Sequence, residues 1–382
     1  MEKLTKDDLL GLVRSVFPRL PQDRFLGILV DIPRLPQKDN PRWLERRQMA
    51  AEWFAVLKDA APSIPLEGVR LIAYPDTESN NADLPASGVL ISGALPPAAS
   101  GIERYGTSAP FDEIFRDTQL FFAPTEFSPT APLKNAAKTF GFRAATMPGF
   151  SAAMIPALKI DYNEVSRRVK ILKEKLDRAE AAEIIFTAED LGNFQIRFDL
   201  RGTTAHTSSG RFTEPGTAGN LPSGETYIVP FEGRPGDPSR TRGTLPVQIG
   251  QEIVLFRVKE NRATEAQGEG LDADAEQKRL TREPAYGNMA ELGFGVLADF
   301  GLQPSGEILL DEKLGLHVAF GRSDHFGGQV GPSAFSSPRE VVHLDRIYIP
   351  AAQPRIIPRS VSLEFPGLKT ELIMSDGRYT IF

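Results

Sequence analysis

The sequence predicts an α/β plus α+β fold, in which an N-terminal parallel-sheet domain is followed by a β-rich C-terminal domain. Two observations indicate this arrangement. Between residues 25 and 150, short apolar runs alternate with helix-like segments, which is typical of a parallel sheet flanked by helices. Beyond residue 190 the apolar period changes to two, which is typical of half-buried strands. We place the boundary near residue 160 and expect domains over residues 1–160 and 161–382.

The first predicted domain begins with an amphipathic helix within residues 1–17, where Thr5 and Asp8 have the spacing of a capping box. Asn40 and Pro41 open a second helix, and further helices are expected near residues 133–140 and from Asp161 onward. The expected strands cover residues 25–30, 69–73, 89–92, 120–123 and 142–146. Neither a glycine-rich dinucleotide turn nor a phosphate loop follows these strands, so we expect a scaffold that also forms a wall of the substrate site.

The second predicted domain consists mainly of strands. They are expected within residues 194–200, 225–231, 247–258, 316–320 and 341–349. Stretches rich in proline and glycine at 232–243 and 327–338 are typical of surface loops, and the polar segment 263–281 is expected to be a loop or an exposed helix.

The composition excludes several classes of protein. Fifty acidic and 44 basic residues give a net charge of −6, which disfavours a nucleic-acid or anionic membrane surface as partner. The chain has no cysteine, so any metal must be held by nitrogen and oxygen ligands. No secretory signal and no run of eighteen apolar residues is present, and we therefore expect a soluble, cytoplasmic protein.

The triplet His343-Leu344-Asp345 is the strongest indication of a metal site. Residues two apart on a strand point to the same side, so the imidazole and the carboxylate would lie next to each other. His317 lies in a second strand-like run, residues 316–320. The sequence thus predicts that His317, His343 and Asp345 supply metal ligands.

Acidic residues upstream could complete such a site, although each has an ordinary alternative role. Glu225 begins a strand after a Pro-Ser-Gly turn but could be a surface residue, and Glu312 could be a solvated turn residue. Glu291 has apolar neighbours, where its carboxylate needs a cation or a structural salt bridge. His317 by itself could be a buried histidine bonded to a backbone carbonyl. Taken together, these residues indicate carboxylates that bridge cations and activate a water, and hence metal-assisted hydrolysis.

Several linked motifs also resemble the aminopeptidase T family of metallo-aminopeptidases. The stretches that carry the resemblance, in order and spacing, are residues 161–165, 220–230, 290–295, 311–313, 317–321 and 343–345. The resemblance implies a two-domain homodimer whose C-terminal domain binds two divalent ions, zinc or cobalt, and removes N-terminal residues from peptides. It implies that the metal ligands are Glu225, Glu291, Glu312, His317, His343 and Asp345.

One position departs from that family pattern. Seven residues after His317 the family has a tyrosine, whereas this chain has Asp324, followed by His325. A phenol can donate a hydrogen bond to a developing oxyanion, and an ionised carboxylate cannot. Asp324 is the candidate catalytic residue, through proton transfer, but the sequence favours a salt bridge with Arg322 instead.

Two other functions remain open from the sequence. His317, His343 and Asp345 alone would suit a mononuclear iron site with open positions for oxygen, and ring-cleaving 2,5-dihydroxypyridine dioxygenases are similar to the same family. The presence of both Glu225 and Glu291 favours a dinuclear hydrolase instead. A non-catalytic relative that binds a peptide or a protein is the third possibility, which the missing tyrosine favours.

Overall fold

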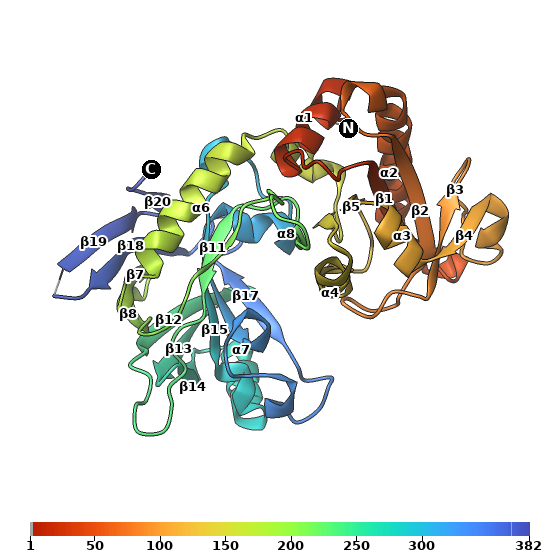
Figure 1. Ribbon diagram of the computed structural model, residues 1–382. Coiled ribbons are helices and arrows are strands. Elements are labelled where there is room, and N and C mark those ends of the chain that lie inside the picture. The colour runs from red at the N-terminus through yellow and green to blue at the C-terminus, as the bar shows by residue number, and fades with distance from the viewer. Residues whose placement is uncertain (1–2, 368) are drawn as a thin grey trace. The chain divides into compact units, whose positions relative to one another are not determined.

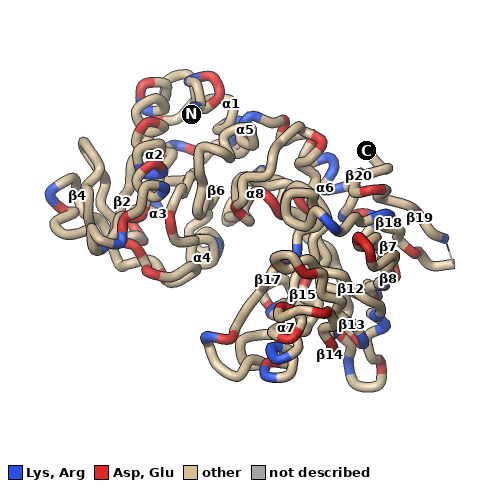
Figure 2. Tube along the Cα trace, turned by 180° about the vertical axis from the view of Figure 1, so that it is seen from behind, with Lys and Arg blue, Asp and Glu red and all other residues tan. Residues whose placement is uncertain are grey.

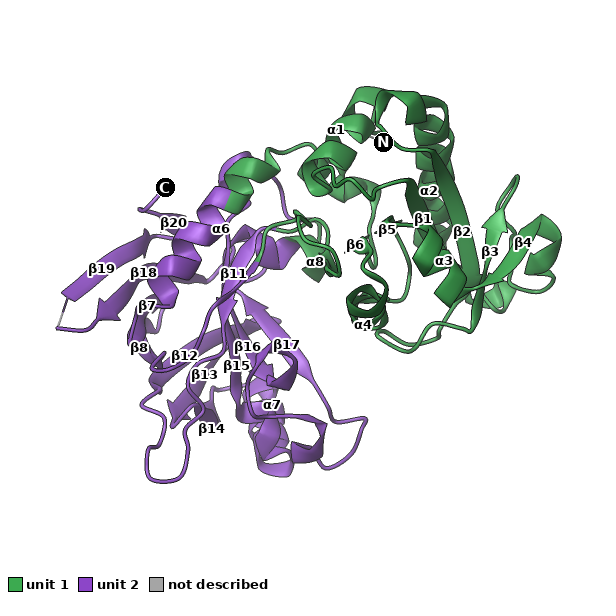
Figure 3. Cartoon of the chain, viewed as in Figure 1, with its two compact units in different colours: residues 1–166, 208–223, 305–310 green, residues 167–207, 224–304, 311–382 purple. Residues whose placement is uncertain are grey.

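The computed structural model describes residues 3–367 and 369–382, which form a mixed α/β structure with three β-sheets (Figure 1). One sheet contains parallel strands, and the other two are antiparallel. The chain divides into two compact units (Figure 3). The first contains residues 1–166, 208–223 and 305–310, and the second contains residues 167–207, 224–304 and 311–382.

The first unit is built on a seven-stranded sheet. Its strands, in spatial order, are β10 (Ala218–Asn220), β6 (Arg143–Thr146), β5 (Leu120–Ala123), β1 (Phe25–Ile32), β2 (Gly68–Pro75), β3 (Ser87–Ile91) and β4 (Gly106–Pro110). The pairs from β10 to β2 are parallel, whereas β3 and β4 add to the edge in antiparallel orientation. The parallel core confirms the predicted alternation of strands and helices, and β4 is a strand that the sequence did not predict.

Helices cover both faces of this sheet. They are α1 (Lys6–Val16), α2 (Pro41–Ala60), α3 (Phe111–Asp117), α4 (Thr130–Phe140) and α5 (Ile155–Leu158). The capping box of Thr5 and Asp8 is confirmed at the start of α1, and the Asn40 side chain caps α2 as expected. On one face, α3 and α4 pack on the alternate strand residues Ile72, Tyr74 and Phe121.

The second unit contains an eight-stranded antiparallel sheet. In spatial order it consists of β14 (Arg262–Gln267), β13 (Glu252–Lys259), β12 (Arg242–Ile249), β8 (Gly192–Asp199), β7 (Ala181–Ala188), β18 (Ile356–Phe365), β19 (Lys369–Ser375) and β20 (Arg378–Tyr379). The expected single run 247–258 is a hairpin of β12 and β13. The polar segment 263–281 contributes β14 as well as a helix, α7 (Leu271–Arg282).

A five-stranded antiparallel sheet packs against this one and carries most of the predicted metal ligands. Its strands, in order, are β17 (His343–Ile347), β16 (Leu316–Gly321), β15 (Met289–Gly295), β11 (Glu225–Ile228) and β9 (His206–Ser208). Phe256 of β13 and Phe320 of β16 have ring centroids 5.0 Å apart, so the even-numbered side chains of β16 face the larger sheet. The odd-numbered ones are therefore left for the opposite face.

The remaining helices are mostly short. Helices α6 (Tyr162–Leu176) and α8 (Ile308–Asp311) cross the division between the units. The 3-10 helices are residues 36–38, 61–63, 102–105, 152–154, 284–287, 298–300, 312–314, 324–326 and 332–334. The predicted stripe of Val165, Val169 and Leu172 on α6 is buried.

Charge and hydropathy of the described residues give two further observations. Lysine and arginine alternate with aspartate and glutamate along the trace (Figure 2). Among the helices of residues 3–367 and 369–382, none combines the length and the apolar composition that crossing a membrane requires.

Candidate metal centre

Four neighbouring strands of the five-stranded sheet bring five of the six predicted ligands, all but Glu312, onto one face. Glu291 of β15 pairs with Ala319 of β16, and Ala319 pairs with Asp345 of β17, so the two carboxylates lie in one row across the sheet. His317 and His343 belong to the neighbouring rows on the same face, because side chains two apart on a strand share a side. The prediction that the His343-Leu-Asp345 triplet presents two ligands together is thus supported by the register.

Small residues leave room for the long side chains on this face. Gly293 is the partner of His317, and a Cβ atom at position 293 would lie 1.9 Å from the imidazole Nε2. The imidazole therefore lies directly over the backbone of β15. Ala319, between Glu291 and Asp345, leaves similar space in its row. Because glycine and alanine lie opposite the long glutamate, aspartate and histidine side chains, these side chains fit together in a buried cluster at the centre of the sheet.

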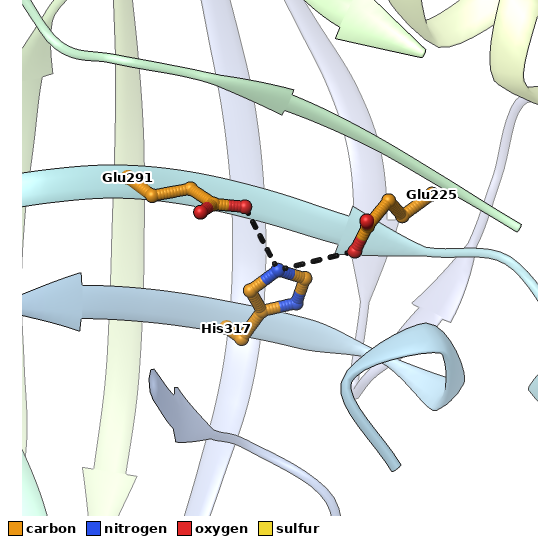
Figure 4. Close-up of side chains that lie close together, drawn as sticks. All are labelled: Glu225, Glu291 and His317. Carbon is orange, nitrogen blue, oxygen red and sulfur yellow. Dashed lines mark hydrogen bonds and ion pairs between the residues drawn. The ribbon is translucent and has the colours of Figure 1, made fainter. Parts of the chain in front are cut away.

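Glu225, Glu291 and His317 form the first of two groups that could hold a metal ion (Figure 4). The Nε2 atom of His317 lies 3.3 Å from Oε1 of Glu291 and 3.6 Å from Oε2 of Glu225. Their side chains are only 1% to 9% exposed. This group is closed to solvent in the unit that contains it.

Glu291, His343 and Asp345 form the second group. The Nε2 atom of His343 lies 3.2 Å from Oε2 of Glu291 and 3.6 Å from Oδ1 of Asp345. The side chains of His343 and Asp345 are 19% and 11% exposed. Glu291 thus belongs to both groups and directs one carboxylate oxygen to each imidazole.

Backbone carbonyls hold both imidazoles in one orientation. Nδ1 of His317 donates to the carbonyl of Gly315 at 3.2 Å, and Nδ1 of His343 donates to the carbonyl of Arg322 at 2.8 Å. With the hydrogen on Nδ1, the Nε2 lone pair of a neutral imidazole points at carboxylate oxygens. The lone pair of Nε2 then faces the lone pairs of the carboxylate oxygens, which repel it. Only a proton or a metal ion between them makes this arrangement favourable.

The pKa values of the cluster reflect this need for positive charge. Burial alone would lower the pKa of His317, but Glu291 and Glu225 raise it to about 9. Burial would also lower the pKa of His343, but the nearby carboxylates of Asp345 and Glu291 raise it to about 11. Burial would raise the pKa of Glu291, yet hydrogen bonds from the two imidazoles hold it well below its usual range.

Glu312 belongs to neither group but is linked to Glu225 through Lys313, a residue that the sequence did not single out. The Lys313 ammonium donates to Oε1 of Glu225 at 2.6 Å and also to Oε1 of Glu312. Burial raises the pKa of Glu312 to about 8, an effect that Lys313 opposes and that Glu225 and Asp345 strengthen. The predicted ligand Glu312 therefore lies beside the cluster as a partner of Lys313.

Asp324 is engaged outside the cluster. Its Oδ1 atom accepts a hydrogen bond from Nε of Arg322 at 2.5 Å and lies 3.6 Å from Nδ1 of His325. The guanidinium of Arg322 lowers the pKa of Asp324. This is the salt bridge that the sequence offered as the alternative to proton transfer.

Of the aromatic rings near His343, the sequence offered His325 as a substrate contact in a glycine-rich loop but did not single out Phe326 or Tyr227. The rings of His325 and Phe326 lie 5.1 and 5.3 Å from that of His343, and Phe326 lies 4.7 Å from Tyr227. Tyr227 follows Glu225 by two residues, so it shares the site face, and strand periodicity could have identified it. Burial, together with the Glu225 carboxylate, raises its pKa.

Replacing Gly293 by alanine should expel the His317 imidazole from its place. The added methyl group would lie 1.9 Å from Nε2 and within 2.4 Å of two ring carbons of His317, so the buried imidazole would have to move. We expect a loss of about 1–3 kcal/mol in the free energy of unfolding from overpacking. Metal affinity should fall by about tenfold or more, because His317 would no longer orient the Glu291 carboxylate. Urea unfolding and metal analysis of the purified variant measure the two effects.

Gly11→Ala is the matched control, because a Cβ atom at that helical position meets nothing within 4 Å. Alanine is favoured over glycine in a helix by up to about 1 kcal/mol, so this variant should be as stable as the parent or more so. Equal behaviour of the two variants would contradict the described position of His317.

Comparison with solved structures supports the fold. The chain matches the structure of a 2,5-dihydroxypyridine dioxygenase from Pseudomonas putida KT2440 with a TM-score of 0.60 and 16% sequence identity. The match covers 99% of this chain and 96% of that one. No protein-family model and no curated protein sequence matches the chain.

These findings correct the assignment to the aminopeptidase T family and the hydrolase function derived from it. The matching structure is a dioxygenase, and the comparisons give no support for a metallo-aminopeptidase that acts on peptides. The physical reason is that the linked motifs describe a sheet bearing nitrogen and oxygen ligands. Such a sheet can serve different reactions, so its ligand pattern does not determine which bond is broken. What the structure supports is two overlapping groups of glutamate, histidine and aspartate side chains that could hold a metal ion.

Proposed function

We propose that this protein is a metal-dependent dioxygenase that opens the ring of a small hydroxylated aromatic compound. The single observation that carries the proposal is the group Glu291, His343 and Asp345, whose nitrogen and oxygen donors meet at a partly exposed position. Nitrogen and oxygen donors of this kind bind divalent first-row metal ions, ferrous iron among them. The likeness in fold to a 2,5-dihydroxypyridine dioxygenase supports this function over the alternatives from the sequence.

In place of the pair of zinc or cobalt ions expected from the sequence, we propose one ion. It would be held by His343 and Asp345 on β17 and by Glu291 on β15, with His317 at the other oxygen of Glu291. A bound ferrous ion supplies the redox chemistry by which molecular oxygen is activated. Dimerisation, a cytoplasmic location and the absence of a nucleic-acid partner remain predictions from the sequence.

The residues around His343 suit a flat substrate. Phe326 and His325 place aromatic rings against the imidazole, and such rings bind planar molecules by offset or edge contacts. Phe326 also lines, together with His206 and Phe231, a cavity of about 350 Å³ that is large enough for a single-ring compound; Glu291, His343 and Asp345 do not line it.

Tyr227 would orient the substrate. Its ring lies between those of His206 and Phe326, at 5.5 and 4.7 Å, and its hydroxyl makes no hydrogen bond to another residue of the described ranges. Its raised pKa keeps the phenol protonated at neutral pH, so it can donate to a substrate oxygen. This role requires a donor on the site face, which Asp324 cannot provide because it is ionised and paired with Arg322.

Oxygen consumption by iron-loaded protein tests the proposal. The protein is reconstituted with ferrous iron without oxygen and then mixed with aerated buffer and 2,5-dihydroxypyridine, a catechol or a hydroquinone carboxylate. We expect oxygen uptake with at least one of them and both atoms of labelled oxygen in a ring-opened product. His343→Gln should reduce the rate by about 100-fold or more through loss of the ion. Iron-loaded protein that consumes no oxygen with any ring compound would exclude this function.

A further inference from the structure

Lys313 is a buried cation inside the carboxylate cluster. Its side chain is 2% exposed, and its ammonium group contacts Glu225 and Glu312. A buried ammonium is costly unless it is paired, so its position next to two carboxylates is a built feature of the fold. Sequence reasoning treated Asp311-Glu312-Lys313 as a source of a ligand and gave the lysine no role.

The backbone holds Lys313 firmly in this place. Its carbonyl accepts a hydrogen bond from the amide of Leu297 at 2.8 Å. A Cβ atom at Gly295 would lie 2.2 Å from the carbonyl carbon of Lys313, so only glycine at the end of β15 allows the two segments to approach so closely. Gly295 is also the strand partner of Glu225. The ammonium and the carboxylate that it contacts are thus positioned by the same strand end.

The two groups that share Glu291 differ in their supply of positive charge. Near Glu225, Glu291 and His317, the protein itself provides the Lys313 ammonium, 2.6 Å from Oε1 of Glu225. The other group, Glu291, His343 and Asp345, has no lysine or arginine within salt-bridge distance among the described residues. A divalent ion next to Glu225 would therefore meet a fixed cation, whereas one next to His343 would not.

We propose that Lys313 takes the place of a second divalent ion, so that this sheet holds one metal ion rather than two. The inference rests on the metal centre of the proposed function, and it concerns how many ions that centre accepts. An ammonium donates hydrogen bonds to the Glu225 carboxylate and to Glu312 and adds a single positive charge, but it neither binds substrate nor changes oxidation state. Lys313 is therefore a positioning residue that restricts the metal to the exposed half of the cluster.

Metal stoichiometry of wild-type protein and of Lys313→Met tests the inference. Each protein is stripped with a chelator, dialysed against manganese(II) and analysed for bound metal per chain. We expect one equivalent in the wild type and two in Lys313→Met, because Glu225 and Glu312 then lack their cation. In the double variant Lys313→Met with Glu225→Gln, the number should return to one. A folded Lys313→Met variant with one equivalent would overturn the proposal.

Lys175→Met is the control for the loss of a lysine that pairs with a glutamate. Lys175 contacts Glu371 at 2.7 Å, and both side chains are partly exposed. This variant should bind the same amount of metal as the wild type. A doubled stoichiometry here would show that the assay counts nonspecific binding, and the inference would lose its support.

Spectroscopy of the wild type keeps the inference testable if Lys313→Met does not fold. Isolated manganese(II) ions and coupled pairs of ions have different electron paramagnetic resonance spectra. With excess manganese(II) removed, we expect the spectrum of isolated ions. A coupled pair in the wild type, or no bound metal at all, would overturn the inference. Failure of the proposed function is distinct, since it would leave one bound ion but no oxygen uptake with any aromatic substrate.

Discussion

The metal-free protein should lose stability as the pH rises from 7 to 10. His317 and His343 have pKa values of about 9 and 11 in the folded protein, above the value of 6.5 for an unperturbed histidine. The folded state thus binds these protons more tightly, and the resulting stabilisation is complete below pH 6.5. It is lost as the pH passes 9 and then approaches 11. Since one pKa unit corresponds to about 1.4 kcal/mol, we expect a loss of about 3 kcal/mol or more.

Urea unfolding in the presence of a chelator at pH 6, 8 and 10 measures this loss. His343→Gln removes one of the two imidazoles and should give a flatter dependence on pH. His206→Gln changes an exposed imidazole outside the cluster, so it should keep the dependence of the wild type. A wild-type stability that does not change between pH 7 and 10 would contradict the protonated pairs between the imidazoles and Glu291.

Replacing Glu291 by glutamine should have the largest effect on stability of any single change in the cluster. The carboxylate contacts both imidazoles, at 3.3 and 3.2 Å, and it is almost fully buried. Glutamine keeps the shape but removes the charge that both protonated imidazoles need. Removing one partner of a buried ion pair costs about 3–5 kcal/mol, and we expect a loss in this range for metal-free protein at pH 7. Metal binding should be lost as well, because Glu291 belongs to both groups.

Glu364→Gln provides a matched comparison. Glu364 accepts two hydrogen bonds from Arg197, at 3.0 and 2.8 Å, but the side chains of Arg197 and Glu364 are 26% and 34% exposed. Exposed pairs contribute up to about 1 kcal/mol, so this variant should lose no more than that and should bind metal normally. Chemical denaturation at pH 7 and metal analysis distinguish the two. Similar losses in both variants would mean that burial of Glu291 does not strengthen its contacts.

Local sequence patterns were sufficient for the parallel sheet of the first unit and for much of the antiparallel structure. Capping residues at Thr5 and Asn40 and apolar runs such as residues 120–123 reflect interactions between near neighbours in the chain. The hairpin of β12 and β13 was read as one strand because its turn, at Gly250 and Gln251, is short and lies between two apolar runs. Strands β7, β18, β19 and β20 were missed, although only the β7–β18 pair joins segments far apart in sequence and the other pairs are hairpins.

The candidate site was predictable where its residues share a strand. His343 and Asp345 needed only the two-residue period of an extended chain, and Tyr227 could have been linked to Glu225 in the same way. The role of Lys313 was not predictable, because a lysine in a polar turn is ordinarily solvated. Its burial depends on the approach of that turn to Gly295, which is a contact between distant segments.

The sequence by itself determined the types of ligand, the absence of thiolate chemistry and the side of each strand on which a ligand lies. These follow from composition and from the geometry of an extended backbone. Only the tertiary structure decided that Glu291 joins two groups and that Lys313 neutralises one of them. The reason is that strand order and register place side chains from positions 225 to 345 within a few ångströms. Charge interactions at such distances depend on that placement and not on neighbours in the chain.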